Sequence, residues 1–303
     1  MSKWWAFALM AALMVSSRLS AQAPRSFASP EDAVNSLIAT VKAGQVAELV
    51  TMFGADGKEL IESSDPATAR QNRRVIAVAL REQWHLEDSA PNRKTLVIGN
   101  EAWPFPVPLV KEESGWHFDA AAGKEEVIAR RIGRNELAAI ATGHAYVTAQ
   151  RRYAERPHDG NPTGVHAAKF ASDSNKENGL YWPSKAGQPR SPLGDLVAQA
   201  AAEGRTVSSD RSQPSPFHGY YFKILTEQGS AAPGGAKKYM VKGLMSGGFA
   251  LVAWPAEYDV TGVMTFVVSQ DGIVYEKDFD TGTDAAARKM TAYNPDKSWH
   301  RVQ

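Results

Sequence analysis

The chain has 303 residues, long enough for two domains, with 34 basic and 33 acidic side chains and a formal net charge of +1. Because non-specific nucleic-acid binding needs a concentrated basic field, this balance excludes nucleic acid as an expected partner. There are no cysteines, which excludes disulfides, thiolate metal sites, cysteine nucleophiles and a lipoprotein cysteine.

Residues 1–23 have the pattern of a secretory signal peptide. Lys3 supplies the positive flank, and the apolar run Trp4–Val15 is well below the ~20 residues that a membrane-spanning helix needs. Cleavage is predicted after Ala21 or Ala23, and an uncleaved anchor is the alternative. No later segment approaches spanning length, so we expect a periplasmic or secreted protein without a transmembrane anchor after cleavage.

Residues 24–123 predict an N-terminal α+β domain of three helices followed by a small antiparallel sheet. Ser29-Pro30-Glu31 is a helix start, with a capping hydroxyl and a proline at the first helical position, and Gly44 ends that helix. A second short helix ends at Gly54, and Asp65-Pro66 opens a third. The predicted strands are Thr95–Ile98, Phe105–Val110 and Gly115–Phe118. This order of elements loosely resembles the cystatin-like and nuclear-transport-factor-like folds.

Residues 124–283 predict a C-terminal domain in which one long helix packs on a four-stranded antiparallel sheet. The helix covers Lys124–Arg156 and ends before Pro157. The long loop 157–216 follows, with a short helix at Pro192–Ala202. The predicted apolar stripe of the long helix contains Val127, Ile128, Ile132, Leu137, Ile140, Ala141, His144 and Val147. The predicted strands are Phe217–Leu225, Gly248–Trp254, Val263–Val268 and Ile273–Lys277. Residues 284–303 are predicted to form a polar tail.

Several long motifs in the second half are specific. They are Phe217–Gly229 (FHGYYFKILTEQG), Gly247–Tyr258 (GGFALVAWPAEY), Thr261–Phe266 (TGVMTF), Asp271–Asp278 (DGIVYEKD) and Tyr293–Trp299 (YNPDKSW). With these motifs the chain resembles a family of secreted bacterial proteins known as domain of unknown function 2950, over nearly the whole mature length. The resemblance implies an envelope location and no agreed activity, and it supplies no catalytic residues.

The long helix and the sheet also resemble the globular head of type IV pilin-like proteins. The segments Asn135–Ile140 and Ala149–Tyr153 are similar to the helix that leads into that head. The chain departs from pilins because the helix is internal and lacks the uninterrupted hydrophobic N-terminal half that anchors them. A pilin-like head used as a soluble scaffold is therefore the prediction, and shared fold does not confer shared function.

Loop 157–190 contains the weak candidates for catalysis. His158, His166 and Asp173 are close enough in sequence to build a hydrolase site, although solvated loop residues are the alternative. None of the seven histidines forms an HExxH or a comparable metal spacing. His144 is predicted to be a packed histidine on the helix. Glu257 and Asp259 are candidate paired carboxylates of a glycosidase, with no known separation.

The same loop suggests a calcium site and an aromatic anchor. Asp173, Asn175 and Glu177 place oxygen ligands at alternate positions, as calcium loops do, but Gly179 comes one place late for an EF-hand. Tyr181 and Trp182 are candidate anchors for a glycan or a partner protein if they are exposed, and a lid over the sheet if they are not.

The sequence is compatible with two functions. The first is a non-enzymatic binding or scaffold module for an envelope protein or glycan. The alternative is a hydrolase acting on cell-wall or surface polymer, with its site in loop 157–190. No cofactor other than calcium is suggested.

Overall fold

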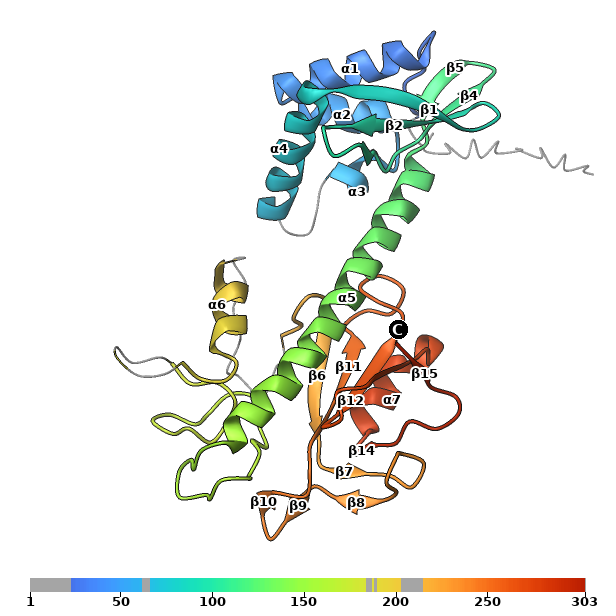
Figure 1. Cartoon of the computed structure of the whole chain (residues 1–303). Coiled ribbons are helices and arrows are strands. Elements are labelled where there is room, and N and C mark those ends of the chain that lie inside the picture. The colour runs from blue at the N-terminus through green and yellow to red at the C-terminus, as the bar shows by residue number, and fades with distance from the viewer. Residues whose placement is uncertain (1–22, 62–65, 184–186, 188–189, 203–214, 303) are drawn as a thin grey trace, which may run out of the picture. The chain divides into compact units, whose positions relative to one another are not determined.

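The computed structural model describes residues 23–61, 66–183, 187, 190–202 and 215–302. The chain divides into two units, 1–127 and 128–303 (Figure 1). The predicted signal peptide lies outside the described residues except for Ala23. Within the described residues no helix is long and apolar enough to cross a membrane.

The helices of the first unit begin and end where the sequence signals predict. Helix α1 (Pro30–Ala43) is capped by Ser29, whose side chain accepts from the backbone N–H of Asp32, and it ends at Gly44 with φ 68°. Helices α2 (Val46–Phe53) and α4 (Pro66–Glu82) match the second and third predicted helices. A short helix, α3 (Gly57–Ile61), was not predicted, because five residues carry too little periodicity.

The sheet of the first unit has the order β1-β2-β4-β5, and β3 pairs with β2. Strand β1 was not recognised in the sequence, and the three prolines around residue 106 shorten β3 to two residues. The aromatic rings of Phe53, Phe105 and Phe118 meet edge to face in the core between helices and sheet. The strands are β1 (Trp84–Ala90), β2 (Arg93–Ile98), β3 (Trp103–Pro104), β4 (Leu109–Glu112) and β5 (Gly115–Phe118).

Helix α5 (Ala120–Ala154) begins earlier than predicted and crosses the predicted domain boundary. The carboxylate of Asp119 accepts a hydrogen bond from the Ala122 N–H at 3.0 Å and caps the helix. The two units divide between Val127 and Ile128, inside α5. The Ala-Ala-Ala-Gly segment at 120–123 is thus the first turn of the helix, and the units divide shortly after the predicted boundary at Gly123.

The second unit contains a five-stranded antiparallel sheet, β15-β13-β12-β11-β6. The four predicted strands are adjacent in this sheet, from β13 to the edge strand β6, and the Asp271-Gly272 turn joins β12 to β13 as the sequence predicts. Together with the first unit, this confirms the α+β class. The strands are β6 (Tyr220–Leu225), β11 (Ala250–Pro255), β12 (Thr265–Ser269), β13 (Val274–Lys277) and β15 (His300–Arg301).

One face of this sheet packs against α5, although through a stripe that differs from the predicted one. Ala139, Tyr146, Val147 and Tyr153 are buried, whereas Leu137 is 69% exposed and His144 is also exposed. The prediction for His144 was wrong because the helix is rich in alanine, so several faces look equally apolar. A Cβ on Gly143 would reach to 3.5 Å from Val268, which places this face of the helix close to β12.

The opposite face is covered by residues that we predicted to be a polar tail. Helix α7 (Thr283–Lys289) packs on β11, with Ala287 fully buried. Lys223 on β6 donates hydrogen bonds to the carbonyls of Ala287 and Arg288 at the end of α7. Tyr293 is 1% exposed and β15 completes the sheet, so the tail prediction was wrong. The apolar residues of segment 284–303 are too few and too widely spaced to show the periodicity of a helix or a strand.

Short elements complete the second unit. Helix α6 (Gly194–Ala202) matches the predicted short helix, and a three-residue 3-10 turn at Asp280–Gly282 precedes α7. The minor strands are β7 (Glu227–Gln228), β8 (Lys237–Lys238), β9 (Met240–Val241), β10 (Leu244–Met245) and β14 (Ala292–Tyr293).

The structural role of the C-terminal residues predicts the effect of Tyr293→Ala. Because removing a large buried aromatic side chain leaves a cavity, we expect a loss of about 3–5 kcal/mol of unfolding free energy, measured by chemical denaturation. Lys297→Ala, at an exposed position in the same segment, is the matched control. Equal stability of the two variants would mean that the segment does not belong to the core.

Candidate functional site

The segment that follows α5 is fastened to the helix by a buried amide. The side chain of Gln150 is fully buried. Its Nε2 donates to the Ala167 carbonyl at 2.7 Å, and its Oε1 accepts from the Ala167 N–H at 2.9 Å. Nε2 is also 3.0 Å from the hydroxyl of Tyr146, which donates to the Ala250 carbonyl on β11. A continuous series of hydrogen bonds thereby joins the helix, the loop and the sheet.

His158, the first catalytic candidate, is a packed side chain. Its ring stacks on Tyr153 with centroids 4.0 Å apart. Nε2 is 3.0 Å from the carbonyl of Tyr153, and Nδ1 is 3.2 Å from the Glu177 carboxylate. The side chain is 5% exposed. These contacts tie the end of α5 to residue 177 and leave both ring nitrogens occupied.

His166, the second candidate, contacts a different part of the unit. Its backbone N–H donates to the carbonyl of Met245 at 2.8 Å, and its Nδ1 donates to the same oxygen at 3.1 Å. The ring lies 4.7 Å from the ring of Phe249. Burial lowers the pKa of His166 below its ordinary value, and the hydrogen bond to Met245 opposes this effect.

Asp173, the third candidate, is held within its own turn. Lys169 Nζ donates to its Oδ2 at 2.6 Å, and Asn178 Nδ2 donates to the same oxygen at 2.9 Å. His158 contacts the end of α5 and, through Glu177, the 169–178 turn in which Asp173 lies, whereas His166 contacts the β9–β10 hairpin.

The calcium candidates have separate partners too. Asp173 contacts Lys169, and the Glu177 carboxylate faces His158, while Asn175 lies exposed in a left-handed turn with φ 61°. Among the residues that the structure describes, no three acidic or histidine side chains gather in a way that would hold a metal ion.

Tyr181 and Trp182 are half-buried and pack against the core of the second unit. The backbone of Tyr181 bonds to the carbonyl of Phe170 and accepts from the N–H of Ser172, and the ring of Trp182 lies 5.6 Å from His158. The aromatic pair therefore packs on the core of the second unit with part of each side chain accessible to solvent.

The carboxylate pair Glu257 and Asp259 lies in a tight turn after β11. The Glu257 N–H donates to the hydroxyl of Thr261, and Asp259 adopts a left-handed conformation with φ 60°. The structure explains this stretch as turn geometry, since Asp tolerates positive φ better than most residues.

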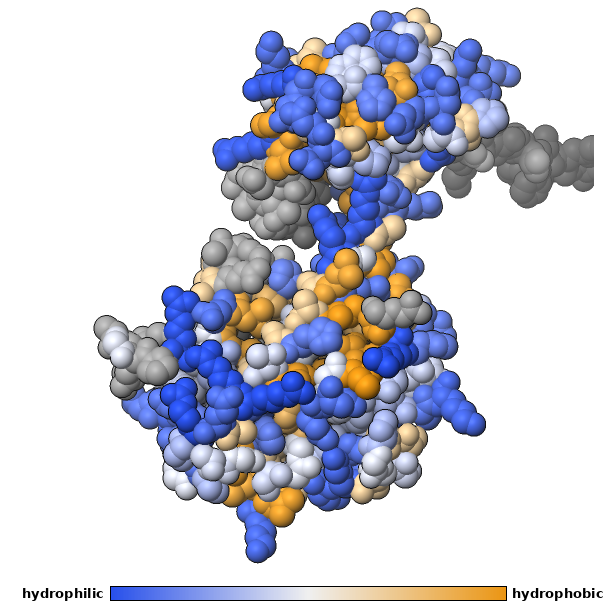
Figure 2. Space-filling view, in the orientation of Figure 1, coloured by the Kyte–Doolittle hydropathy of each residue, from blue (hydrophilic) through white to orange (hydrophobic). Residues whose placement is uncertain are grey.

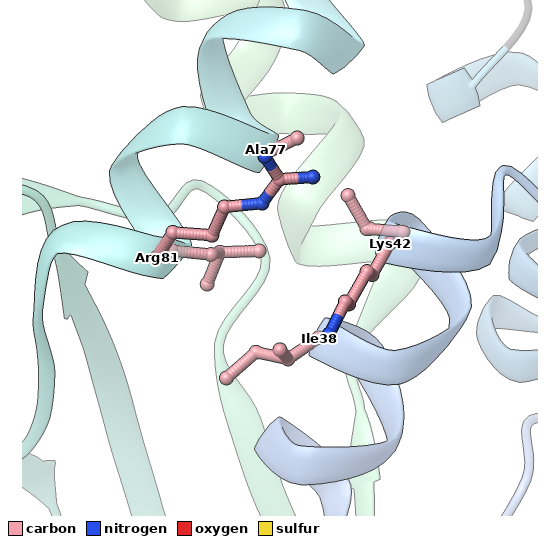
Figure 3. A pocket seen from close by; sticks show the side chains of 6 residues that line it. Ile38, Lys42, Ala77 and Arg81 are labelled. Atoms are coloured by element: carbon pink, nitrogen blue, oxygen red, sulfur yellow. The ribbon is translucent and has the colours of Figure 1, made fainter.

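The first unit has a groove that the sequence did not reveal. It lies between α1 and α4 and is lined by Ile38, Val41, Lys42, Ala77, Leu80 and Arg81 (Figure 3); we call it the α1–α4 groove. Apolar and hydrophilic surface alternate over these helices (Figure 2). The available signal in the sequence was that Val75 and Val78 fall outside the stripe formed by Ile76, Ala79 and Leu80 on α4; both valines are more than half exposed.

The two units define an α+β protein in which an antiparallel sheet lies between a long helix and a short C-terminal helix. A family model for a protein of unknown function, DUF2950, matches residues 24–302. The chain therefore belongs to the DUF2950 family. No curated protein and no solved structure is significantly similar to it, so the pilin-like resemblance stays a prediction.

The contacts of the 169–178 turn predict that calcium does not stabilise the protein. A lysine and a histidine already face the two carboxylates, and a ligand stabilises a protein only if it binds the folded state preferentially. We expect melting temperatures in millimolar calcium and in chelator to agree within about 1 °C. A rise of several degrees in calcium would restore the calcium interpretation.

The lowered pKa of His166 predicts a pH-dependent contribution to stability. Because the folded state disfavours the protonated ring, this contribution is present above the ordinary pKa of about 6.5 and is lost as the pH falls below it. When the pH is lowered from about 7.5 to about 5.5, we expect the melting temperature of His166→Phe to fall by less than that of the unchanged protein. His144→Gln, at an exposed position on α5, is the control and should follow the unchanged protein.

Proposed function

We propose that this protein is a non-enzymatic binding or scaffold module of the bacterial cell envelope. The observation that carries the proposal is the use of the candidate catalytic groups as structural ties. His158 fastens the end of α5, His166 fastens the β9–β10 hairpin, and Asp173 is engaged by Lys169. A hydrolase needs its acid, base or nucleophile near one reacting bond, and these three serve different contacts.

The location rests on the N-terminal pattern over residues 1–23, which would direct the chain through the Sec pathway to the periplasm or the exterior. The partner is an envelope protein or a glycan. A pilin-like helix-on-sheet unit would serve as a rigid scaffold, and folds of this type support many unrelated functions.

Export predicts a shortened mature protein. The intact mass of the chain purified from the envelope of its own organism should correspond to a start at Gln22 or at Pro24. A mass that includes Met1–Ala21 would mean that the segment remains as an anchor or that the protein is not exported.

The binding function predicts a stable partner in the native envelope. In-cell crosslinking followed by affinity purification of the mature protein should recover one partner in stoichiometric amount. The competing function, a hydrolase with its site in loop 157–190, predicts instead that the purified protein cleaves cell-wall polymer. That cleavage should then disappear in the variant His166→Asn with Asp173→Asn. A monomer that lacks a partner and shows this cleavage would overturn the proposal.

A further inference from the structure

The middle of helix α5 lies between two anchored parts of the same helix. On the N-terminal side, a Cβ at Gly123 would lie 2.7 Å from Cγ2 of Val107, so the helix backbone packs directly on the first unit. On the C-terminal side, Asn135 Nδ2 donates to the Thr261 carbonyl at 2.8 Å, and the Glu136 carboxylate accepts from two backbone N–H groups of the second unit. Each end of this middle part is therefore fixed to one unit.

Between these anchors the helix has little support from packing. Every residue from Lys124 to Ala138 is exposed or half-buried, whereas Gly123 before this stretch and Ala139 after it are buried. Because most helical stability in proteins comes from the packing of an apolar face, this stretch depends largely on its own helix propensity. The division between the two units falls here as well, between Val127 and Ile128 (Figure 1).

The sequence of this stretch has a low helix propensity. The segment 127–132 contains three β-branched residues, whose rotamers are restricted in a helix. Glu126 and Arg130 have the favourable order of charges at i,i+4 spacing, but Arg130 and Arg134 repeat the same charge at that spacing. Attraction and repulsion thus oppose each other along one face, and the net support from charge is small.

Gly133 is the glycine of α5 that packing does not explain. Gly123 and Gly143 each lie against a neighbouring side chain, with Cβ positions 2.7 Å from Val107 and 3.5 Å from Val268. At Gly133, which is exposed, a Cβ would meet nothing within 4 Å among the residues that the structure describes. Since glycine in a helix interior lowers helix stability relative to alanine, Gly133 weakens the helix without improving a contact.

We propose that residues 128–134 of α5 form a hinge between the two units. The helical hydrogen bonds of this segment open and re-form while Gly123 and Glu136 stay anchored, so each unit keeps its fold as its orientation changes. A hinge needs a few residues that absorb the change in φ and ψ, and such motions take microseconds to milliseconds. The hinge does not depend on the proposed binding function.

The first test measures amide hydrogen exchange along α5 in the full-length mature protein. Relative to the rates of an unstructured chain, we expect the amides of residues 130–134 to exchange at least about a hundredfold faster than those of residues 146–150. Gly133→Ala should slow the first group about fivefold and leave the second group unchanged, because alanine favours the helix. Equal protection of the two groups in the unchanged protein would overturn the hinge.

The second test uses proline, which removes a helical hydrogen bond and clashes with the preceding turn. Gly133→Pro should leave the melting temperature of the second unit within about 2 °C of the unchanged protein, because this unit does not depend on that turn. Ala141→Pro, at an exposed position in the packed part of α5, is the matched control and should lower it by roughly 6–12 °C. A similar loss in both variants would mean that the turn at Gly133 belongs to the fold of the unit.

The third test measures the motion itself. Because the chain has no cysteine, spin labels can be attached at two introduced cysteines alone. Lys42→Cys with Ala285→Cys labels one exposed position in each unit, and Lys242→Cys with Ala285→Cys labels two exposed positions in the second unit as the control. The distances from double electron–electron resonance should be broadly distributed for the first pair and narrowly for the control, and Gly133→Ala should narrow the first distribution. A first pair as narrow as the control would contradict the proposal.

Discussion

The side-chain amide of Gln150 forms with the backbone of Ala167 the pair of hydrogen bonds that a neighbouring strand would form. This pairing is buried, and a buried polar group left without a partner costs about 1–3 kcal/mol. The segment after α5 has almost no regular structure of its own, so its path depends on such fixed points. Tyr146 continues the chain of hydrogen bonds to β11, across 104 residues of sequence, and so ties the loop to the sheet as well as to the helix.

A second set of polar contacts fixes the same helix further toward its N-terminus. One carboxylate oxygen of Glu136 accepts from the N–H groups of Val263 and Met264, at 2.9 and 3.0 Å. The hydroxyl of Tyr220 donates to the Met264 carbonyl, and burial together with Glu136 raises the pKa of this tyrosine. Gly262 fits here because a Cβ would lie 2.2 Å from the Tyr220 hydroxyl oxygen. Polar contacts at Glu136 and at Gln150 therefore position the helix, and the small residues Ala139 and Gly143 lie between these two points.

The sequence predicted the elements whose signals are local. Ser29 and Gly44 bound α1, and Asp271-Gly272 marks the hairpin, because capping and turn chemistry act within a few residues. The sequence predicted the structure incorrectly where one local pattern is compatible with several structures. The alanine-rich α5 has no single apolar face in its sequence, and the contact of His158 with Glu177 depends on a turn that no periodicity describes. The α1–α4 groove arises only when two helices far apart in sequence pack together.

The sheet of the second unit closes with β15, at His300–Arg301, and Tyr293 lies in its core. The strands that α5 covers come more than 60 residues after the helix ends, at Tyr220 and beyond. Contacts between such distant segments form slowly, since the loop between them must close first. Folding of this unit therefore waits until the last residues of the chain are available. If the chain is exported as we propose, its second unit would stay unfolded during synthesis. It could then be translocated as an unfolded chain and fold on the far side of the membrane.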